Sequence, residues 1–500
     1  MTEKIKPSTE QEHILSLAEA GKSIVGIARA GAAKTTTARW AIQNRSHTLR
    51  AGKKILVWAF NSQVESDMQA NINKNGLTQS VDVFTFHRFA RRKIGHQYQQ
   101  SRFSNRWPSG KDISQALSID RAYYPWGNPI SVGYTVLETI QKFCLSSDTE
   151  ISYKHIPLPD GAAIDTASFE AVRNYARKAW LKMGPQGDLP VTHDVYLKAF
   201  ALSCPDIAKD YDMVVLEEGQ DINPVIIGMV ESFAKHIQVL VFGDPLQQIY
   251  DWRDAEDALT YFADKAEFTE VQLTTSYRFG EAIAQATKDM VKAQLGKTIV
   301  LNGANSGDKI GPFHPALQRT IITRTNSEIL LELHKCAENG IPAKAQKDMT
   351  ELLNLINAAE AIKSGHPVVD GPLSKFKTWE DLELHAMSKT GQEFQGLLNM
   401  HKRFNGFDIP RKIIEKSNAT EDNIALRARI GTAHTFKGSE FPFVQLGGGF
   451  IDKASDNKRW TPEEARILYV AMTRAKKGMD ISTVSSFLQS KSNHLPKSGV

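Results

Sequence analysis

Residues 23–37, SIVGIARAGAAKTTT, run from a short apolar segment through a turn of small residues into a helical stretch. A turn of this kind at a helix N-terminus, followed by a lysine, is an arrangement that proteins use to hold phosphate groups. Lys34 is placed to reach the β and γ phosphates of a nucleotide, and Thr35 to offer its hydroxyl to Mg²⁺. The stretch therefore predicts a strand, a phosphate loop and a helix.

The sequence of the loop departs from the common phosphate-loop motif. In the common pattern GxxxxGK[ST] two glycines bracket the loop, but here Ala28 and Ala33 stand at those places and Gly31 remains. Alanine lacks the access of glycine to positive φ, so we expect Ala33 to adopt a helical or extended conformation. Taken alone, the segment also fits a small-residue turn before an ordinary helix.

Short apolar runs of the buried-strand type recur along the chain, with helical stretches between several of them. This alternation favours a mainly parallel sheet covered by helices. A first series lies at 54–60, 82–86, 213–216 and 237–242, and a second begins at 271–273 and continues at 320–323, 430–432, 443–446 and 479–482.

Two segments interrupt these series. Residues 88–190 look mostly helical, with Pro and Gly punctuation at WPSG and YPWGNP. Residues 346–425 are rich in Lys, Glu and Leu at helical spacing. Each segment is therefore predicted to be a helical insertion.

An acid pair follows the predicted strand at 213–216. In VVLEEGQD, residues 214–221, the placement suits one carboxylate for a metal ion and the next for an attacking water. Glu217 is the candidate metal ligand, with Thr35, and Glu218 is the candidate for polarising water. A solvated loop is the alternative interpretation of such a pair.

The composition is that of an ordinary globular protein: 500 residues, 41% apolar and 23% charged, with a net charge of +5 that permits an anionic partner without requiring one. The three cysteines are far apart in sequence, which argues against a zinc site or a disulfide framework. No apolar run approaches the roughly 20 residues of a membrane span, and the first residues lack the apolar core of a signal peptide. We expect a soluble cytoplasmic protein without a membrane partner, from a bacterium or a phage-infected host.

Six segments in one order carry a family resemblance. They are ARAGAAKTTT (28–37), VVLEEGQD (214–221), GDPLQQIYDWR (243–253), SYRF (276–279), HTFKGSEF (434–441) and YVAMTRAK (469–476). The set resembles the motor of superfamily 1 DNA helicases of the UvrD/Rep type, although that family spells the acid segment DEAQD. Residues 191–224 are similar in more detail to the helicase core of the F-box DNA helicase family, and no F-box region is expected before the motor.

The resemblance implies an α/β fold with two RecA-like P-loop domains, each with a parallel sheet and each interrupted by a mainly helical insertion. The implied order is motor domain 1A (1–87), insertion 1B (88–190), 1A again (191–272), motor domain 2A (273–345), a small insertion 2B (346–425), and 2A again with a C-terminal tail (426–500).

The resemblance also implies an ATP site with Mg²⁺ as cofactor. The loop residues would hold the phosphates, Gln11 would contact the adenine edge, Tyr277 would stack on the base, and Glu440 would lie near the ribose. Gln247 would sense the γ phosphate, and Arg278 and Arg474 would stabilise charge on the transferring group. The implied catalytic residues are Lys34, Glu218, Gln247, Arg278 and Arg474, and the loop contacts are Ala30, Gly31, Ala32, Ala33, Lys34, Thr35 and Thr36.

Single-stranded DNA is the implied partner, together with duplex junctions. Binding without sequence preference requires aromatic faces for bases and polar or cationic groups for phosphates. The implied contacts are Phe60, Asn61, Thr85, Phe86, His87, Trp252 and His434. A stretch of interleaved basic and aromatic residues at 88–111 fits either a nucleic-acid surface or a solvated helix face with an apolar anchor.

The expected function is an ATP-dependent helicase or translocase that moves along single-stranded DNA from 3′ to 5′, in replication, repair or recombination. The sequence is compatible with a monomer. The alternative is a hydrolysis-deficient relative that acts as an ATP-gated DNA-binding or recruiting module.

Overall fold

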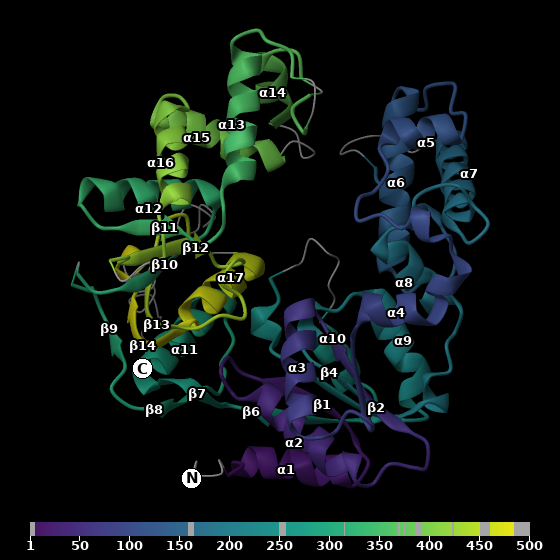
Figure 1. The fold of residues 1–500 in the computed structure, drawn as a ribbon, viewed down its shortest axis with the longest axis vertical. Coiled ribbons are helices and arrows are strands. Elements are labelled where there is room, and N and C mark those ends of the chain that lie inside the picture. Colours follow the sequence, from purple (N-terminus) through teal and green to yellow (C-terminus); the bar gives the residue numbers. More distant parts are fainter. Residues whose placement is uncertain are drawn as a thin grey trace, which may run out of the picture. The chain divides into compact units, whose positions relative to one another are not determined.

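The computed structural model describes residues 6–158, 165–249, 257–314, 316–368, 371–374, 376–386, 392–422, 425–450 and 461–484 (Figure 1). The chain divides into two compact units. The first comprises residues 1–28 and 33–273, and the second comprises residues 29–32 and 274–500.

The first unit is built on a six-stranded parallel sheet with strand order β3-β2-β4-β5-β1-β6. The central strands β4 and β5 are buried at every residue, as expected for a sheet covered on both faces. The strands are β1 (Ser23–Ala28), β2 (Lys54–Ala59), β3 (Val81–Thr85), β4 (Tyr211–Leu216), β5 (Gln238–Gly243) and β6 (Phe268–Leu273). The helices that alternate with them are α1 (Thr9–Glu19), α2 (Lys34–Ser46), α3 (Ser62–Lys74), α9 (Pro224–Ala234) and α10 (Ala258–Ala263).

Between β3 and β4, the described residues form five α-helices. They are α4 (Phe86–Ile94), α5 (Gly110–Ala116), α6 (Pro129–Leu145), α7 (Thr166–Met183) and α8 (His193–Leu202), of which α5, α6 and α7 lie together in Figure 1. They share one hydrophobic core with the sheet. Trp58 of β2 links the two parts, because its ring packs edge-on against Phe86 and Phe89 of α4. The helical segment is therefore anchored on the sheet.

The second unit has its own six-stranded parallel sheet, with strand order β11-β12-β10-β13-β14-β9, and a separate pair β7-β8. Its strands are β7 (Thr275–Gly280), β8 (Asn302–Asn305), β9 (Lys309–Ile310), β10 (Arg319–Thr323), β11 (Ala343–Ala345), β12 (Ala428–Thr432), β13 (Phe441–Leu446) and β14 (Ala475–Asp480). Helices α11 (Glu281–Leu295), α12 (Asn326–Glu338) and α17 (Pro462–Met472) accompany this sheet, and α13 (Thr350–Lys363), α14 (Trp379–Ala386), α15 (Gln392–Phe404) and α16 (Asp408–Ala419) lie between β11 and β12.

Two α/β units with parallel sheets, each carrying a helical segment, confirm the predicted fold class. Within the described residues, no helix combines the length and apolar character that a bilayer crossing requires.

Two details of the strand prediction are wrong. Residues 271–273 were expected to begin the second sheet, but they belong to β6, which pairs with β1 along Ser23–Ala28 in the first sheet. Short apolar strands do not encode which sheet they join. Phe86, expected within a strand, is the first residue of α4, because the Thr85 side chain accepts a hydrogen bond from the Arg88 backbone and starts the helix.

Candidate functional site

The phosphate loop joins β1 to α2 and contains two residues with positive φ. Gly31 has φ +76°, which costs glycine little. Ala33, the N-cap of α2, has φ 57° and ψ 35° and makes no side-chain capping bond. The expectation of a helical or extended Ala33 is therefore wrong: the loop keeps the left-handed turn that a glycine would adopt, and alanine adopts it at a steric cost.

Lys34 and Glu218 form an ion pair at the carboxyl ends of β1 and β4. Lys34 Nζ lies 2.5 Å from Glu218 Oε1, and both side chains are largely shielded from solvent. Glu218 is itself left-handed, with φ 57° and ψ 42°. Non-glycine residues in this region are uncommon and are worth relating to function.

Gln220 fixes the other oxygen of Glu218. Its amide nitrogen donates to Glu218 Oε2 at 2.5 Å, while its amide oxygen accepts from the Asp244 backbone N–H at 3.0 Å. Gln220 is fully buried, so the amide links the ends of β4 and β5. The sequence contained this signal in the EEGQD segment, but it was not used.

Glu217 and Thr35 meet in the same place. Thr35 Oγ1 donates to Glu217 Oε2 at 3.1 Å, whereas Glu217 Oε1 is buried without a hydrogen-bond partner. Burial raises the pKa of Glu217 to about 6, against the opposing influence of Lys34. A buried carboxylate oxygen beside a threonine hydroxyl fits Mg²⁺, which takes one or two protein ligands and completes its shell with phosphate and water. No cluster of three or more metal-ligand side chains occurs in the described part of the chain.

Gln247 and Gln11 also lie in the first unit. Gln247 Nε2 donates to Asp244 Oδ2 at 2.9 Å, and the backbone N–H of the same aspartate donates to Gln220. Gln11 is buried in α1: its oxygen accepts from the Ser8 backbone, and its nitrogen donates to Thr37 Oγ1 at 3.0 Å. The Gln11 amide thus connects the start of α1 to α2.

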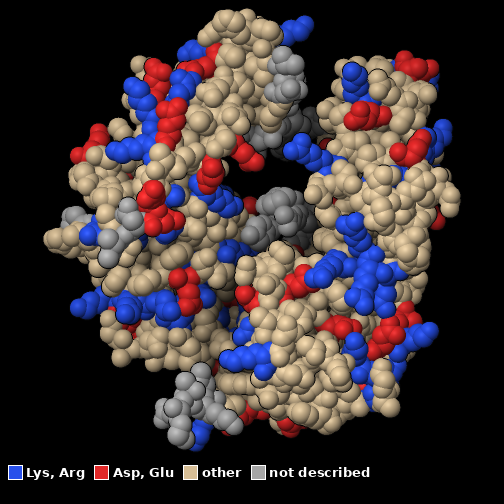
Figure 2. Space-filling view, viewed as in Figure 1, with Lys and Arg blue, Asp and Glu red and all other residues tan. Residues whose placement is uncertain are grey.

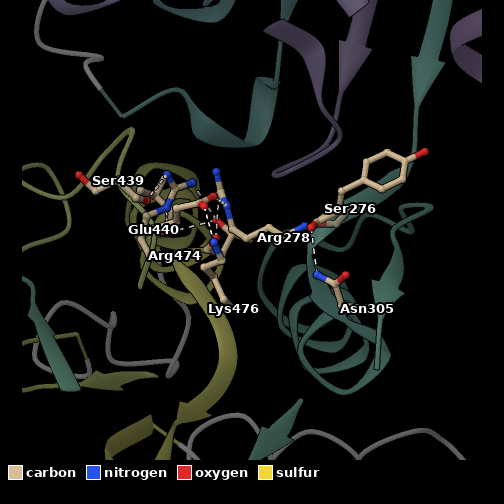
Figure 3. Close-up of polar contacts among 10 residues, drawn as sticks. Ser276, Arg278, Asn305, Ser439, Glu440, Arg474 and Lys476 are labelled. Carbon is tan, nitrogen blue, oxygen red and sulfur yellow. Dashed lines mark hydrogen bonds and ion pairs between the residues drawn. The ribbon is translucent and has the colours of Figure 1, made fainter. Parts of the chain in front are cut away.

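The remaining predicted nucleotide residues gather in the second unit (Figure 3). Glu440 bridges two cations, accepting from Arg278 Nε at 2.9 Å and from Lys476 Nζ at 2.7 Å. Burial raises the pKa of Glu440, but the hydrogen bonds from Lys476 and Arg278 outweigh it and hold the pKa below its usual value. Arg278 also donates to the Thr473 carbonyl at 2.8 Å.

Arg474 is almost fully buried beside this cluster, at 1% exposure. Its Nε donates to the Val470 carbonyl at 2.9 Å and Nη1 to the Ser439 carbonyl at 3.3 Å. Tyr277, in contrast, is 45% exposed on β7. Hydrogen bonds to backbone carbonyls of the second unit therefore fix the side chain of Arg474. The exposed ring of Tyr277 is available for stacking.

A groove of about 640 Å³ in the first unit is lined by three of the predicted DNA contacts of that unit. Phe60, Phe86 and His87 line it, and Trp107 joins them from the helical insertion. Asn61 and Thr85 have capping roles, because their side chains accept hydrogen bonds from the Val64 and Arg88 backbones. The groove thus combines aromatic faces with polar side chains.

The basic and aromatic stretch at 88–111 has mixed roles. Arg102 is buried and donates five hydrogen bonds to the carbonyl oxygens of Lys182, Gly184, Pro185 and Leu189. Tyr98 is buried as well, so both residues are structural. His434 lies half-buried after β12 in the second unit. Trp252 falls outside the described residues.

Asp194 is a groove residue that the sequence did not indicate. It lies in α8 and lines the groove, with Oδ1 3.2 Å from His87 Nε2. A lone aspartate in an amphipathic helix carries no pattern that distinguishes it from a solvated surface residue.

Comparison with known proteins supports a family resemblance. A model of the UvrD-like helicase C-terminal domain matches residues 376–486, and a model of the AAA domain matches residues 11–253. These two matches confirm the predicted resemblance to superfamily 1 helicases of the UvrD/Rep type.

The similar proteins are named as DNA helicases. The chain is 25% identical to "F-box DNA helicase protein 1" of Schizosaccharomyces pombe, over 86% of this chain and 52% of that protein. It is 28% identical to "F-box DNA helicase 1" of Gallus gallus, over 95% of this chain and 49% of that protein. It is 30% identical to "DNA helicase II" of Rickettsia typhi, over 37% and 29%. The chain spans about half the length of the two F-box helicases, and the range of organisms does not support the expected bacterial or phage source.

Proposed function

We propose that this chain is an ATP-dependent DNA translocase or helicase that acts on single-stranded DNA, with Mg²⁺ as cofactor. The observation that carries the proposal is the arrangement at the carboxyl ends of β1 and β4. There the Lys34–Glu218 pair and the Thr35–Glu217 contact lie side by side, and the same unit carries an aromatic groove. The family and the helicase names of the relatives support this proposal.

In the proposed reaction, Lys34 and the loop backbone bind the phosphates, and Glu218 orients and polarises the attacking water. Gln220 keeps the Glu218 carboxylate in place through one oxygen. Glu217 and Thr35 are the residues that would hold Mg²⁺, which neutralises developing charge on phosphoryl oxygens. Gln247, whose amide is held by Asp244, would respond to the γ phosphate.

The second unit contributes cations for the transferring phosphoryl group. Arg278 and Arg474 are the proposed residues, and both are oriented by backbone carbonyls of their own unit. Two arginines fixed in this way lose little side-chain freedom when they meet the charge of the transition state. Tyr277 would stack on the base, and Glu440 would lie near the ribose.

DNA would bind through the aromatic groove, with bases stacked on Phe60, Phe86 and Trp107 and a phosphate near His87. Alternating nucleotide states would tighten and loosen this grip, giving movement from 3′ to 5′. Duplex junctions would be the substrates for unwinding.

The test is the ATPase rate with and without single-stranded DNA. We expect DNA to stimulate the parent strongly and Lys34→Ala and Glu218→Gln to lose the stimulated rate. Lys74→Ala and Glu231→Gln are matched controls: Lys74 is exposed at the end of α3, and Glu231 pairs with Lys265 on the surface. A background rate in the parent that DNA does not change would refute hydrolysis-driven movement and leave the alternative, an ATP-gated binding or recruiting module.

A further inference from the structure

Beyond the edge of the aromatic groove, a row of aromatic side chains continues from His87. From His87, the ring centroid of His193 is 5.8 Å away and that of Tyr196 is 6.4 Å away. Tyr196 packs edge-on against Phe103 at 5.7 Å, and the guanidinium of Arg91 lies 4.3 Å from the Phe103 centroid. These ring contacts connect the groove to Arg91, with Tyr196 buried beneath His193 and Phe103.

Arg91 is one helical turn beyond His87 on α4, so the two side chains share a face about 6 Å apart along the axis. Arg91 is exposed, and no carboxylate pairs with it in the described part of the chain; its polar contact is a long hydrogen bond to Gln100 Oε1 at 3.4 Å. Its charge reaches the groove rim: burial, followed by the charges of His87 and Arg91, lowers the pKa of His193. Figure 2 shows Lys and Arg gathered over α4.

A second exposed arginine adjoins the same rim. Arg106 immediately precedes Trp107, which lines the groove, and follows Asn105, whose Oδ1 lies 3.0 Å from His193 Nε2. Arg106 is exposed and has no carboxylate partner among the described residues. Arg91 and Arg106 therefore both stand next to side chains of the rim.

The other cations of α4 are engaged differently. Lys93 Nζ lies 2.6 Å from Asp210. Arg92 lies over the Phe84 ring at 5.3 Å and in a separate small pocket with Lys93, Asp82 and Asp210. Arg88 Nη1 lies 2.7 Å from Glu65 Oε1. Arg88 and Lys93 are therefore paired with carboxylates, whereas Arg91 has no carboxylate partner among the described residues.

We propose that Arg91 and Arg106 form a phosphate-binding track, outside the groove, for single-stranded DNA that leaves it across His193 and Phe103. This inference rests on the proposed function and extends its DNA contact beyond the aromatic groove. The chemistry is that of two unpaired guanidinium groups beside a path of rings, which suits a backbone of repeated negative charges.

The test is the salt dependence of binding to a fluorescent dT oligonucleotide of about 16 nucleotides, followed by anisotropy without nucleotide. Each phosphate contact contributes about 0.7 to the slope of log K against log salt for a single strand. For Arg91→Gln with Arg106→Gln, we expect the slope to fall by about 1.4. This corresponds to a loss of affinity on the order of 25-fold at 0.1 M salt that vanishes near 1 M.

The matched control is Arg88→Gln with Lys93→Gln, which removes the same charge from two cations of α4 that pair with carboxylates. We expect its slope to stay near that of the parent, and unchanged melting curves will show that both variants fold. An unchanged slope in the Arg91 and Arg106 variant overturns the track. An equal fall in the control overturns it too, because a general field of the helix would then explain the effect.

A fall confined to a duplex probe would also overturn the proposal, since it assigns the track to a different DNA form. The same experiments distinguish failure of the proposed function from failure of the phosphate-binding track. A parent that binds no DNA and shows no DNA-stimulated ATPase refutes both ideas, whereas normal parent behaviour with an unchanged variant refutes the track alone.

Discussion

Replacing Ala33 with glycine should stabilise the protein, although it removes a methyl group. Ala33 is left-handed at the N-cap of α2. This conformation costs an L-residue about 1–2 kcal/mol, and glycine adopts it almost freely. The greater freedom of glycine in the unfolded chain offsets about 0.4–1 kcal/mol of that gain. The expected net effect is a rise of about 0.8 kcal/mol in the free energy of unfolding.

For a unit of this size, that difference raises the melting temperature by about 2–3 °C, which differential scanning calorimetry can measure. Ala32→Gly is the matched control in the same loop. Ala32 is buried and is not among the residues with positive φ. Glycine there brings an entropic cost of about 0.5–1 kcal/mol and also loses a buried methyl group, so both effects destabilise the variant.

The two variants should therefore shift the transition in opposite directions. If Ala33→Gly lowers the melting temperature as Ala32→Gly does, the left-handed conformation does not carry the strain assigned to it. Affinity for ATP should stay within about twofold of the parent in Ala33→Gly, because the loop conformation is unchanged. A larger change would show that the loop has rearranged.

Three further predictions follow from the contacts of single side chains. The pKa of Glu217 is raised from 4.5 to about 6, so between these pH values the native carboxyl keeps a proton that the unfolded chain has lost. The free energy of unfolding of the parent should therefore fall by roughly 2 kcal/mol as the pH rises through this range. Urea unfolding at pH 4 and pH 7 should show this fall in the parent and not in Glu217→Gln. Gln220→Leu should lower kcat about tenfold with little change in KM, because Glu218 loses its orienting donor; an altered KM alone would contradict this role. Arg102→Ala should cost about 3 kcal/mol or more by leaving carbonyl oxygens unpaired, with Arg106→Ala as the neutral control in thermal unfolding.

The sequence predicted the local secondary structure of the candidate nucleotide site well. A buried apolar run, a small-residue turn and a helix are all encoded within one short window, and β1 and α2 appear where the pattern placed them. The acid pair likewise follows β4 directly. Neighbouring residues sufficed for these predictions, because the chemistry of a strand-to-helix turn depends on backbone direction over a few positions.

Features that depend on distant partners were not predictable. The pairing of β6 with β1 joins residues about 245 positions apart, and nothing in the β6 segment specifies that partner. Arg102 resembled its basic neighbours in sequence, yet it is buried because carbonyl oxygens from the end of α7 and the following loop converge on it. Burial of a charged side chain is decided by what surrounds it in space.

The left-handed residues Ala33 and Glu218 stand on opposite sides of one ion pair. Lys34 follows Ala33 directly, and its amine contacts the carboxylate of Glu218. Strain of this kind persists only where surrounding contacts enforce it. For Glu218, the buried amide of Gln220 supplies such a contact. The left-handed backbone of Glu218 and the amide of Gln220 together set the direction of the Glu218 carboxylate. A longer or shorter acid could not keep the contacts with both Lys34 and Gln220. A site that only bound phosphate would need the charge of Lys34 but not this fixed carboxylate, so the geometry argues for water activation over passive nucleotide binding.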